Sequence, residues 1–558
     1  MKRKPLLAKL VFFLVLASLI ISLGACNTAT TTSTQGTTKG TTTGTTSQAT
    51  TVPVDPSDRF GRYAETVTVS VLSTDLKSTA IQYDSSNPDR KSATENIWID
   101  AYLEHLNIKV DRRIAEDATA LNAIINTGMA SGDLADIMIV SKEMFYTLME
   151  NGVCADIGPA YEAYVSSHGT MLRDAIATYP DGLNSVTFNG QVLAVPQYGN
   201  VHGNSEVLWI RQDWLDAVGK TAPTTINELI AVAEAFQAAK FNGKDIIGLG
   251  LTNVPSSIMA AYGVVMDTWH QKPDNSYVFS NVRDEMKSGL LAVQDLYKRG
   301  LVKSDFAVTN VLGEEVANGL VGMYYGPAWH AVTHVQANMN NEPDAVWTAV
   351  KIPSLDGSDI KQWTNDTLST FFVVNKDAKN PEAIFKMLEL EMKLFYEPTA
   401  EEKLKYYYTE DDYQIWNFRV FRNFIYALQD HMRAEAIIDS LNRKDESIAL
   451  FAEASYDRVK KGLAGDRSVY GFYLGFVIGH PIIIEKREKN LLYGGYNGPL
   501  TENMTLYQST INEALTNAML KVITGDSISV FENAVATWYS SGGQAITDDV
   551  NAYYRSMN

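Results

Sequence analysis

The sequence has only two cysteines among its 558 residues, Cys26 and Cys154. One disulfide at most could form, so the fold must be held together by its hydrophobic core and not by a covalent framework. A chain of this length can bury such a core. It is too long for a single one, which indicates about two to four domain-sized units.

Positive charge is also scarce, since 47 lysines and arginines stand against 65 aspartates and glutamates, a formal net charge of −18. Four of the basic residues and no acidic residue lie among the first 25 positions, so removal of that segment would lower the charge to −22. A chain this acidic is not suited to bind nucleic acid or an anionic membrane surface through charge. We therefore expect no nucleic-acid partner.

Recognisable catalytic motifs are missing: the sequence has no HExxH, GxSxG or CxxC motif. The segment Gly219-Lys220-Thr221 has Trp214 where a P-loop would have its first glycine. His330 and His334 have the i, i+4 spacing of a helical metal pair, but no third ligand is evident, and we interpret them as a solvated helix face. An exported glycosidase or lyase stays open as an alternative, because 65 acidic residues allow many carboxylate pairs.

The first 25 residues have the pattern of a secretory signal. A basic start is followed by an apolar run over residues 10–23 that is too short to span a bilayer comfortably. Leu23-Gly24-Ala25-Cys26 resembles the bacterial lipobox, in which the thiol is acylated and the signal is cut away. This resemblance implies a lipid on Cys26 and a position on the outer face of the cytoplasmic membrane. An ordinary cleaved signal is the alternative.

Residues 26–57 indicate a flexible tether. From Asn27 to Val52 the sequence is almost entirely threonine, serine, glycine, glutamine and alanine, with Lys39 as its one charge. Such a segment behaves as a coil with a root-mean-square reach of roughly 30 Å. No apolar run after Leu23 is long enough to span a bilayer, so the lipid would be the membrane anchor.

Beyond the tether, β-branched runs alternate with amphipathic segments. We expect strands at residues 66–72, 108–110 and 135–140, and helices at 93–106, 118–130 and 144–151. This alternation is typical of an α/β fold with a mainly parallel sheet. Ligands of open sheets bind beyond the carboxyl ends of the strands, so the loops after Leu72 and Val140 are the first places to look.

Two local patterns predict particular turns and helix ends. Asn189-Gly190 lies between two short apolar runs, which is the pairing expected of a tight hairpin turn. Thr225 opens a helical pattern, and Glu228 follows three residues later, so the two residues can form a capping box.

Several segments, in order, resemble the extracellular solute-binding proteins of family 1, the receptors of carbohydrate importers. The segments are ASGDLADI at 130–137, FNGQVLAVP at 188–196, RQDWLD at 211–216 with Pro223 and Thr225, GLVGM at 319–323 with GPAW at 326–329, and NPEA at 380–383. At the C-terminus, YNGP at 496–499, KVITGD at 521–526, WYSSGG at 538–543 and NAYY at 551–554 resemble the long lipoproteins of the LipO group. The resemblance extends over almost all of residues 60–558.

The resemblance implies a periplasmic-binding-protein-like type II fold, in which two α/β lobes joined by a hinge close on a ligand between them. Lobe 1 would comprise residues 58–198 and 371–490, and lobe 2 residues 199–370 and 491–558. It also implies a monomeric ABC-transporter receptor that captures an oligosaccharide, delivers it to the transmembrane permease subunits and is not an enzyme. A peptide receptor on the same fold is a further alternative.

A sugar site needs aromatic platforms surrounded by planar hydrogen-bonding groups. Segments that face the ligand in this family, and loops that follow strands, give these candidates: Trp269, Tyr325, Trp329, Trp363, Tyr198, Asn200, Lys142 and Asp75. Arg211 could hold an acidic sugar, although a structural pairing with Asp213 or Asp216 explains it equally well. Trp214 begins a helix and is more consistent with packing.

One departure from the family concerns metal. Relatives such as the alginate-oligosaccharide receptors carry a calcium loop after the helix that follows the first crossover. In this sequence Lys240 and Phe241 stand where oxygen ligands would be needed, and calcium takes six to eight oxygens. We therefore expect no calcium, and no cofactor, in this protein.

Overall fold

The computed structural model describes residues 61–557, except for 75–82, 167–169, 180–181, 199–204, 308–311, 365–367, 408–414, 423, 425, 427, 494–495 and 497. The expected lipidation site Cys26, the tether, and the candidate ligand residues Asp75 and Asn200 lie outside the described residues.

A five-stranded mixed sheet organises the first half of the chain. Its order is β2 (Ile108–Ala115), β1 (Val67–Thr74), β3 (Ile137–Val140), β13 (Leu368–Val374) and β6 (Val195–Tyr198). The first three strands are parallel, as the sequence predicts, whereas β13 is antiparallel to both β3 and β6. The expected parallel sheet is therefore correct only for its N-terminal part, because β13 enters the sheet after the chain has built a second one.

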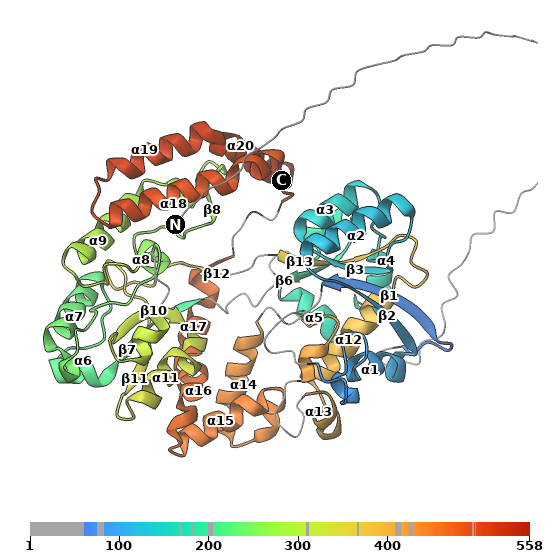
Figure 1. Ribbon diagram of the computed structural model, residues 1–558, viewed down its shortest axis with the longest axis horizontal. Helices are drawn as coiled ribbons and strands as arrows, with labels where there is room; N and C mark the ends of the chain where they lie inside the picture. The colour runs from blue at the N-terminus through green and yellow to red at the C-terminus, as the bar shows by residue number, and fades with distance from the viewer. Residues whose placement is uncertain are drawn as a thin grey trace, which may run out of the picture. The chain divides into compact units, whose positions relative to one another are not determined.

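Helices cover both faces of this sheet. Figure 1 shows α2 (Ala118–Ser131) and α3 (Lys142–Glu150) on one side, with α1 (Ile97–Leu106) and α12 (Ala383–Tyr396) on the other. Asn96 caps α1 by accepting hydrogen bonds from the backbone N–H groups of Trp98 and Ile99. The buried residues of these elements form one hydrophobic core, which draws on residues 69–195 and again on 368–426.

The predicted hairpin turn is confirmed. Strands β4 (Thr187–Phe188) and β5 (Gln191–Val192) pair antiparallel around Asn189 and Gly190. Both turn residues have positive φ, 51° and 78°, as a type I′ turn requires. The hairpin leads directly into β6 of the first sheet.

A second sheet has β7 (Glu206–Arg211) at its centre, paired antiparallel with β10 (Met323–Pro327) and β11 (Trp347–Val350). The predicted capping box is present, since Thr225 and Glu228 exchange both hydrogen bonds at the start of α7 (Ile226–Ala239). The helices α9 (Glu285–Lys298), α18 (Ser509–Ile523), α19 (Ser529–Trp538) and α20 (Gln544–Met557) belong to the core on this sheet. Figure 1 shows α18 beside α9, with α19 next to α18 and α20 toward the C-terminus.

A continuous helical stretch packs against the second sheet: α16 (Tyr470–Tyr473), the π-helical turn η10 (Leu474–Gly479) and α17 (His480–Asn490). Leu474 and Ile483 share a core with Val207 and Trp209 of β7. The sequence places residues 371–490 in lobe 1, and this boundary stays a prediction. Phe472, Tyr473, Phe476 and Val477 of the stretch also pack against a small cluster formed by residues 437–459.

Three glycines explain why this stretch can lie so close to its neighbours. Gly471, Gly475 and Gly479 are spaced by four, and a Cβ on Gly471 would collide with the carbonyl oxygen of Ala331. A Cβ on Gly475 would lie 3.2 Å from the carbonyl oxygen of Ala328, and one on Gly479 would lie 3.4 Å from the Trp209 ring. Small side chains on one helix face therefore permit the close approach.

The same stretch bears on the expectation that no apolar run after Leu23 is long enough to span a bilayer. Within the described residues, the helix over Arg467–Glu485 is long and apolar enough to cross a membrane by length and composition alone. A third of its most apolar window is buried (33%), and the buried members include Leu474, which shares a core with Val207 and Trp209. Core helices of globular proteins pass the same test, so a single such helix is weak evidence for a membrane span.

Candidate functional site

A cavity of about 1050 Å³ lies mainly against the second core. Its lining comes from several elements that are far apart in sequence, and Asn184 and Ser185 of η3 (Asn184–Val186) contribute from the first core. Aromatic side chains form part of its wall: Trp269, His270, Tyr277, Tyr553 and Tyr554. A cavity of this size is at the upper end of the range for small-molecule sites, roughly 300 to 1000 Å³.

Trp269 is held in the cavity wall by a chain of rings. It begins β8 (Trp269–Gln271), which pairs antiparallel with β9 (Tyr277–Phe279). Its ring centroid lies 5.7 Å from that of Phe279, which in turn stacks on Trp538 at 5.6 Å and 11°. Because Trp269 is only half-buried, one part of its ring is fixed by the core and another part is available to a ligand.

A second aromatic pair stands across β9. Tyr277 stacks on Tyr554 of α20, with centroids 4.0 Å apart and planes at 16°. Asn551, one turn earlier on α20, accepts from the Tyr277 backbone N–H and donates to its carbonyl oxygen. The C-terminal helix therefore positions this wall of the cavity.

Charges of both signs line the cavity, namely Arg283, Lys361, Asp356 and Asp359. The Arg283 guanidinium donates to Glu285 at 2.7 Å and to the Gly263 carbonyl at 3.1 Å. Burial, with the charge of Arg283 nearby, lowers the pKa of His270 below its usual value of 6.5. These residues offer hydrogen bonds to a polar ligand but no concentrated field of one sign.

A smaller pocket of about 220 Å³ adjoins the second sheet and is lined by Glu206, Ser257 and Tyr325, among others. Tyr325 lies in β10, and Glu206 is the first residue of the neighbouring strand β7. In the antiparallel register Tyr325 is opposite Leu208, two residues from Glu206, so both side chains reach the same pocket. Ser257 Oγ donates a hydrogen bond to a Glu206 carboxylate oxygen. Burial raises the pKa of the Glu206 carboxyl, and the hydrogen bond from Ser257 opposes this effect.

Helix α8 (Ser256–Ala261) connects the two hollows. Its first residues, Ser256 and Ser257, line the smaller pocket, and its last residues, Ala260 and Ala261, line the larger cavity. The two candidate binding regions are thus neighbours along a single short helix.

Of the predicted site residues, Trp269 and Tyr325 line these two hollows. For Trp363 in β12 (Gln362–Thr364) and Tyr198 in β6 the structure describes the strands, and their side chains lie outside the described part. The roles of Trp363, Tyr198, Asp75 and Asn200 in ligand binding stay predictions.

Lys142, a predicted ligand residue at the start of α3, makes a contact with the chain itself. Its Nζ donates to the carbonyl oxygen of Tyr496 at 2.9 Å and lies 5.3 Å from the centre of the Tyr496 ring. Burial lowers the pKa of the Lys142 ammonium to about 8. A ligand that used this ammonium would have to compete with the Tyr496 carbonyl.

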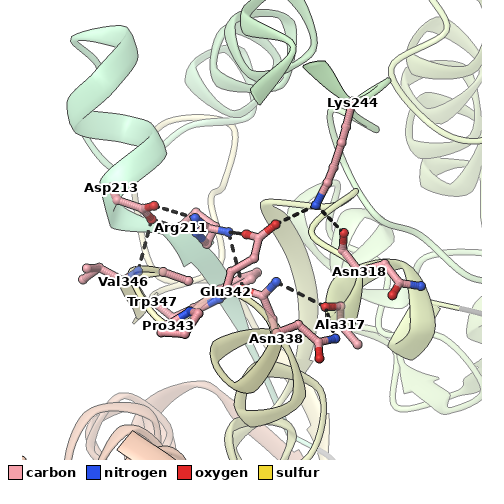
Figure 2. A network of polar contacts seen from close by, with 12 residues as sticks. Arg211, Asp213, Lys244, Ala317, Asn318, Asn338, Glu342, Pro343, Val346 and Trp347 are labelled. Carbon is pink, nitrogen blue, oxygen red and sulfur yellow. Dashed lines mark hydrogen bonds and ion pairs between the residues drawn. The ribbon is translucent and has the colours of Figure 1, made fainter. Parts of the chain in front are cut away.

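Arg211 belongs to a buried network of polar contacts, which Figure 2 shows. Its guanidinium is 4% exposed, donates to Asp213 Oδ1 at 2.7 Å and pairs with Glu342 Oε2 at 2.8 Å. Glu342 also accepts from Lys244 at 2.6 Å. Carboxylates of the chain occupy both ends of the guanidinium, which favours the structural pairing, and a role of Arg211 in holding an acidic sugar stays a prediction.

Trp329 projects from η6 (Ala328–Val332) and is 45% exposed. It lines neither of the two hollows described above. Its ring meets the edge of His330, and His330 stacks on His334 with centroids 3.9 Å apart and planes at 13°. A contribution of Trp329 to ligand binding stays a prediction.

The two histidines do not form the solvated helix face that we expected. His330 lies in η6, His334 begins α11 (His334–Asn341), and both rings stack against buried Tyr324. Burial, followed by the proximity of His334, lowers the pKa of His330 to about 3. Across the part of the chain that the structure describes, no cluster of three or more histidine, cysteine or acidic side chains could hold a metal ion.

Trp214 is a packing residue, as predicted. It is 3% exposed and stacks on Phe241 with centroids 4.3 Å apart and planes at 12°. Phe241 stands at a position where a calcium loop would need an oxygen, and Lys244 of the same loop is engaged with Glu342. The expectation of no calcium stays a prediction that these contacts support.

No local pattern in the sequence indicates that Glu206, Asn184 or the pair Tyr553 and Tyr554 of α20 line a hollow. Each lies far along the chain from the other lining residues, and pairing of strands or helices that are distant in sequence brings them together. Such pairings cannot be worked out from local periodicity.

Comparison with known proteins gives one family. The family model described as "Bacterial extracellular solute-binding protein" matches residues 98–386, which is more than half of the chain. The fructooligosaccharide ABC transporter substrate-binding protein FusA of Streptococcus pneumoniae is 25% identical over 199 residues, 32% of this chain and 37% of FusA. The polygalacturonan/rhamnogalacturonan-binding protein YtcQ of Bacillus subtilis is 23% identical over 295 residues, 50% of this chain and 55% of YtcQ. The chain thus aligns with about half or less of each relative's length.

Solved structures agree on the fold. FusA of S. pneumoniae in complex with fructo-nystose matches with a TM-score of 0.55 and 13% identity, over 88% of this chain and 100% of that one. A solute-binding protein of Bifidobacterium longum infantis described as binding HMO matches with a TM-score of 0.56 and 16% identity, over 88% and 99%. The alginate-binding protein AlgQ2 without calcium ion gives a TM-score of 0.53 and 13% identity over 88% and 99%. The predicted fold class is confirmed.

Proposed function

The chain belongs to the bacterial extracellular solute-binding protein family, and from this premise we propose that it is the receptor of a carbohydrate ABC importer. The family is one of binding proteins and not of enzymes, as the resemblance of the sequence to it implies. In this role the protein captures an oligosaccharide outside the cytoplasm and delivers it, unaltered, to a membrane permease.

The observation that carries this proposal is the cavity of about 1050 Å³ with Trp269, Tyr277, Tyr553 and Tyr554 in its wall. A sugar presents apolar C–H faces, which stack on aromatic rings, and hydroxyls, which need polar partners at the rim. Arg283, Lys361 and Asp356 supply such partners in the same cavity. The relatives FusA and YtcQ are named for binding saccharides, which supports the same ligand class for this chain.

We further propose that the two cores correspond to two lobes that close on the ligand. Asn184 and Ser185 belong to the half of the chain that builds the first sheet, and the rest of the cavity wall belongs to the half that builds the second. A ligand that contacts both lobes stabilises the closed state, because only that state offers both sets of contacts.

The membrane attachment is part of the proposal. A lipid on Cys26 would hold the receptor at the outer face of the cytoplasmic membrane, and residues 26–57 would let the folded body move above it. A single acyl chain binds membranes only weakly, so the proposal implies more than one chain on the anchor.

A thermal-shift screen of the body from residue 58 onward against neutral and acidic oligosaccharides tests the proposal. A bound sugar should stabilise the protein by roughly 3 to 4 kcal/mol when its concentration is about a hundred to a thousand times the dissociation constant. Stabilisation by peptides but by no saccharide would favour the peptide-receptor alternative.

A further inference from the structure

We propose that the smaller pocket is a subsite for one uncharged sugar ring, and that Glu206 disfavours any ring that carries a carboxylate. This inference rests on the proposed function, because it assigns a specificity to a site that must first bind an oligosaccharide. The pocket holds about 220 Å³. That volume is below the roughly 300 to 1000 Å³ of a whole ligand site, so it suits a single ring of a longer ligand.

The buried hydroxyl of Tyr325 is evidence that a polar ligand enters this pocket. Tyr325 is 8% exposed, and its Oη is buried without a hydrogen-bond partner among the described residues. A buried polar group without a partner costs free energy, and a native protein rarely leaves one unless something else satisfies it. A ring hydroxyl that enters the pocket would supply the missing hydrogen bond.

Glu206 supplies the complementary acceptor. Ser257 Oγ already donates to this carboxylate, and no ion pair joins Glu206 to a cation in the described part of the chain. Burial raises the pKa of this carboxyl, and in its ionised form it accepts hydrogen bonds and cannot donate them. Its remaining lone pairs therefore match the O–H donors of a neutral sugar.

Among the described residues, a carboxylated ring finds no counter-charge in this pocket. Glu206 is the one acidic residue of the described lining, which includes no lysine, arginine or histidine. A second carboxylate would either repel Glu206 or force one of the two carboxyls to take up a proton, as happens when two carboxylates share a site. Both outcomes reduce affinity at neutral pH.

The pocket is placed to receive the end of a ligand that occupies the larger cavity. Helix α8 lines the pocket with its first residues and the cavity with its last, and six residues of helix extend over about 9 Å. A second link runs through residues 361 and 362. Lys361 lines the larger cavity, and the side chain of the next residue, Gln362, donates to the backbone carbonyl of Glu206 at 3.2 Å. A short oligosaccharide stacked on Trp269 can thus present its terminal ring to Glu206.

The inference separates two ligand classes that the relatives represent. A fructooligosaccharide is neutral, whereas polygalacturonan carries a carboxylate on each of its uronate rings. The ionised form of Glu206 would favour neutral oligosaccharides, or those whose terminal ring is neutral.

The test compares ligands that differ only in the carboxylate. The probes are an oligogalacturonide, the same oligomer after reduction of its carboxyl groups to primary alcohols, and fructo-nystose as a second neutral ligand. Dissociation constants are measured for the wild type, Glu206→Gln and Asp284→Asn in about 0.5 M salt, which screens exposed charges. Asp284→Asn is the matched control, since it removes one negative charge at a 91% exposed side chain that lines neither hollow.

We expect the wild type to bind a neutral probe at least about tenfold more tightly than the acidic oligomer, the factor that accompanies a one-unit shift of a carboxyl pKa. Glu206→Gln should reduce this ratio about tenfold, and Asp284→Asn should leave it unchanged. Equal or tighter binding of the acidic oligomer by the wild type, or the same ratio in both variants, overturns the inference. Failure of every saccharide to bind the wild type overturns the proposed function instead.

A second variant covers the case in which Glu206→Gln does not fold. Tyr325→Phe removes one oxygen and keeps the ring, and loss of one hydrogen bond should weaken binding of the neutral probe about fivefold. The melting temperature should not fall, because the lost hydroxyl has no protein partner in the described structure. An unchanged affinity for the neutral probe would show that no ring hydroxyl reaches Tyr325 and would overturn the subsite.

Discussion

The Arg211 guanidinium pairs with the Glu342 carboxylate over 2.8 Å, and these side chains are only 4% and 17% exposed. Lys244 and Asp213 complete the pairing, so two cations and two carboxylates neutralise each other beside the second sheet. Trp347 Nε1 and Arg211 both approach Asn338 Oδ1, which ties the network to β11 and α11. The network therefore links β7, β11 and α11 beside the second sheet.

Replacement of Arg211 should therefore act on stability. Arg211→Ala would leave Glu342 and Asp213 short of their main partner, and removal of one partner of a buried pair costs about 3 to 5 kcal/mol. Arg113→Ala is the matched control, because Arg113 pairs with Asp111 and Asp133 but is 40% exposed, and exposed pairs are worth about 1 kcal/mol or less. Urea unfolding of both variants measures the difference. Similar losses would contradict a structural role specific to Arg211.

The same network predicts a pH dependence. Burial by itself would raise the pKa of Glu342, but hydrogen bonds from Lys244 and Arg211 outweigh it, and the pKa is lowered from its usual value of 4.5. A carboxyl whose pKa is lowered by folding stabilises the folded state above pH 4.5 and loses that contribution as the pH falls through the folded-state pKa. Glu342→Gln should thus be less stable than the wild type at pH 7, and the gap should shrink below pH 4.5. A gap in the free energy of unfolding that stays constant down to acidic pH would rule out this linkage.

Trp269 should act on affinity more than on stability. Its half-buried ring lines the cavity, and loss of an aromatic platform weakens binding by about 2 kcal/mol or more. Trp214→Ala is the contrasting case, since a 3% exposed core tryptophan should cost about 3 to 5 kcal/mol of stability when truncated. Calorimetric titration and melting curves of the two variants separate the roles. A Trp269→Ala protein that is strongly destabilised yet binds normally would make Trp269 a core residue.

Trp329→Ala should leave the free energy of unfolding nearly unchanged, because the side chain is 45% exposed. Its affinity decides the predicted ligand role: a loss of about 2 kcal/mol would mean that the ligand reaches η6. Wild-type affinity in this variant would confine the site to the two hollows near α8.

The lipid anchor can be tested independently of the fold. Cys26→Ala removes the expected acylation site, and the folded body should then appear in soluble form outside the cell. Fractionation of cells that express the wild type and the variant measures this. Membrane retention of the variant equal to that of the wild type would contradict an anchor at Cys26.

Local patterns in the sequence predict helices, strands and turns, but they do not predict which residues meet at the ligand site. The positive φ angles at Asn189 and Gly190 and the capping box of Thr225 follow from residues that are neighbours in the chain. Trp269 and Tyr325 could be proposed because they stand in segments that resemble a family. Arg211 was ambiguous because its partner Glu342 is 131 residues away, and nothing local indicates which carboxylate it meets.

Two packing arrangements that the sequence does not indicate have the same origin. The glycine face of Gly471, Gly475 and Gly479 fits the helical stretch 470–490 against η6 and Trp209 of β7. His330 and His334 have helical spacing, but their stacking on Tyr324 depends on how η6 turns after β10. In both cases a distant packing partner decides the outcome, and periodicity within one segment cannot reveal it.

The most direct test of the central claim is a calorimetric titration of the body with fructo-nystose and the wider oligosaccharide panel, followed by mass analysis of the recovered sugar. A solute-binding receptor should bind at least one oligosaccharide stoichiometrically, one per monomer, and return it chemically unchanged after prolonged incubation. Recovery of shortened or eliminated products would mean that the protein is an enzyme. Absence of binding across the panel would contradict its assignment as a carbohydrate receptor.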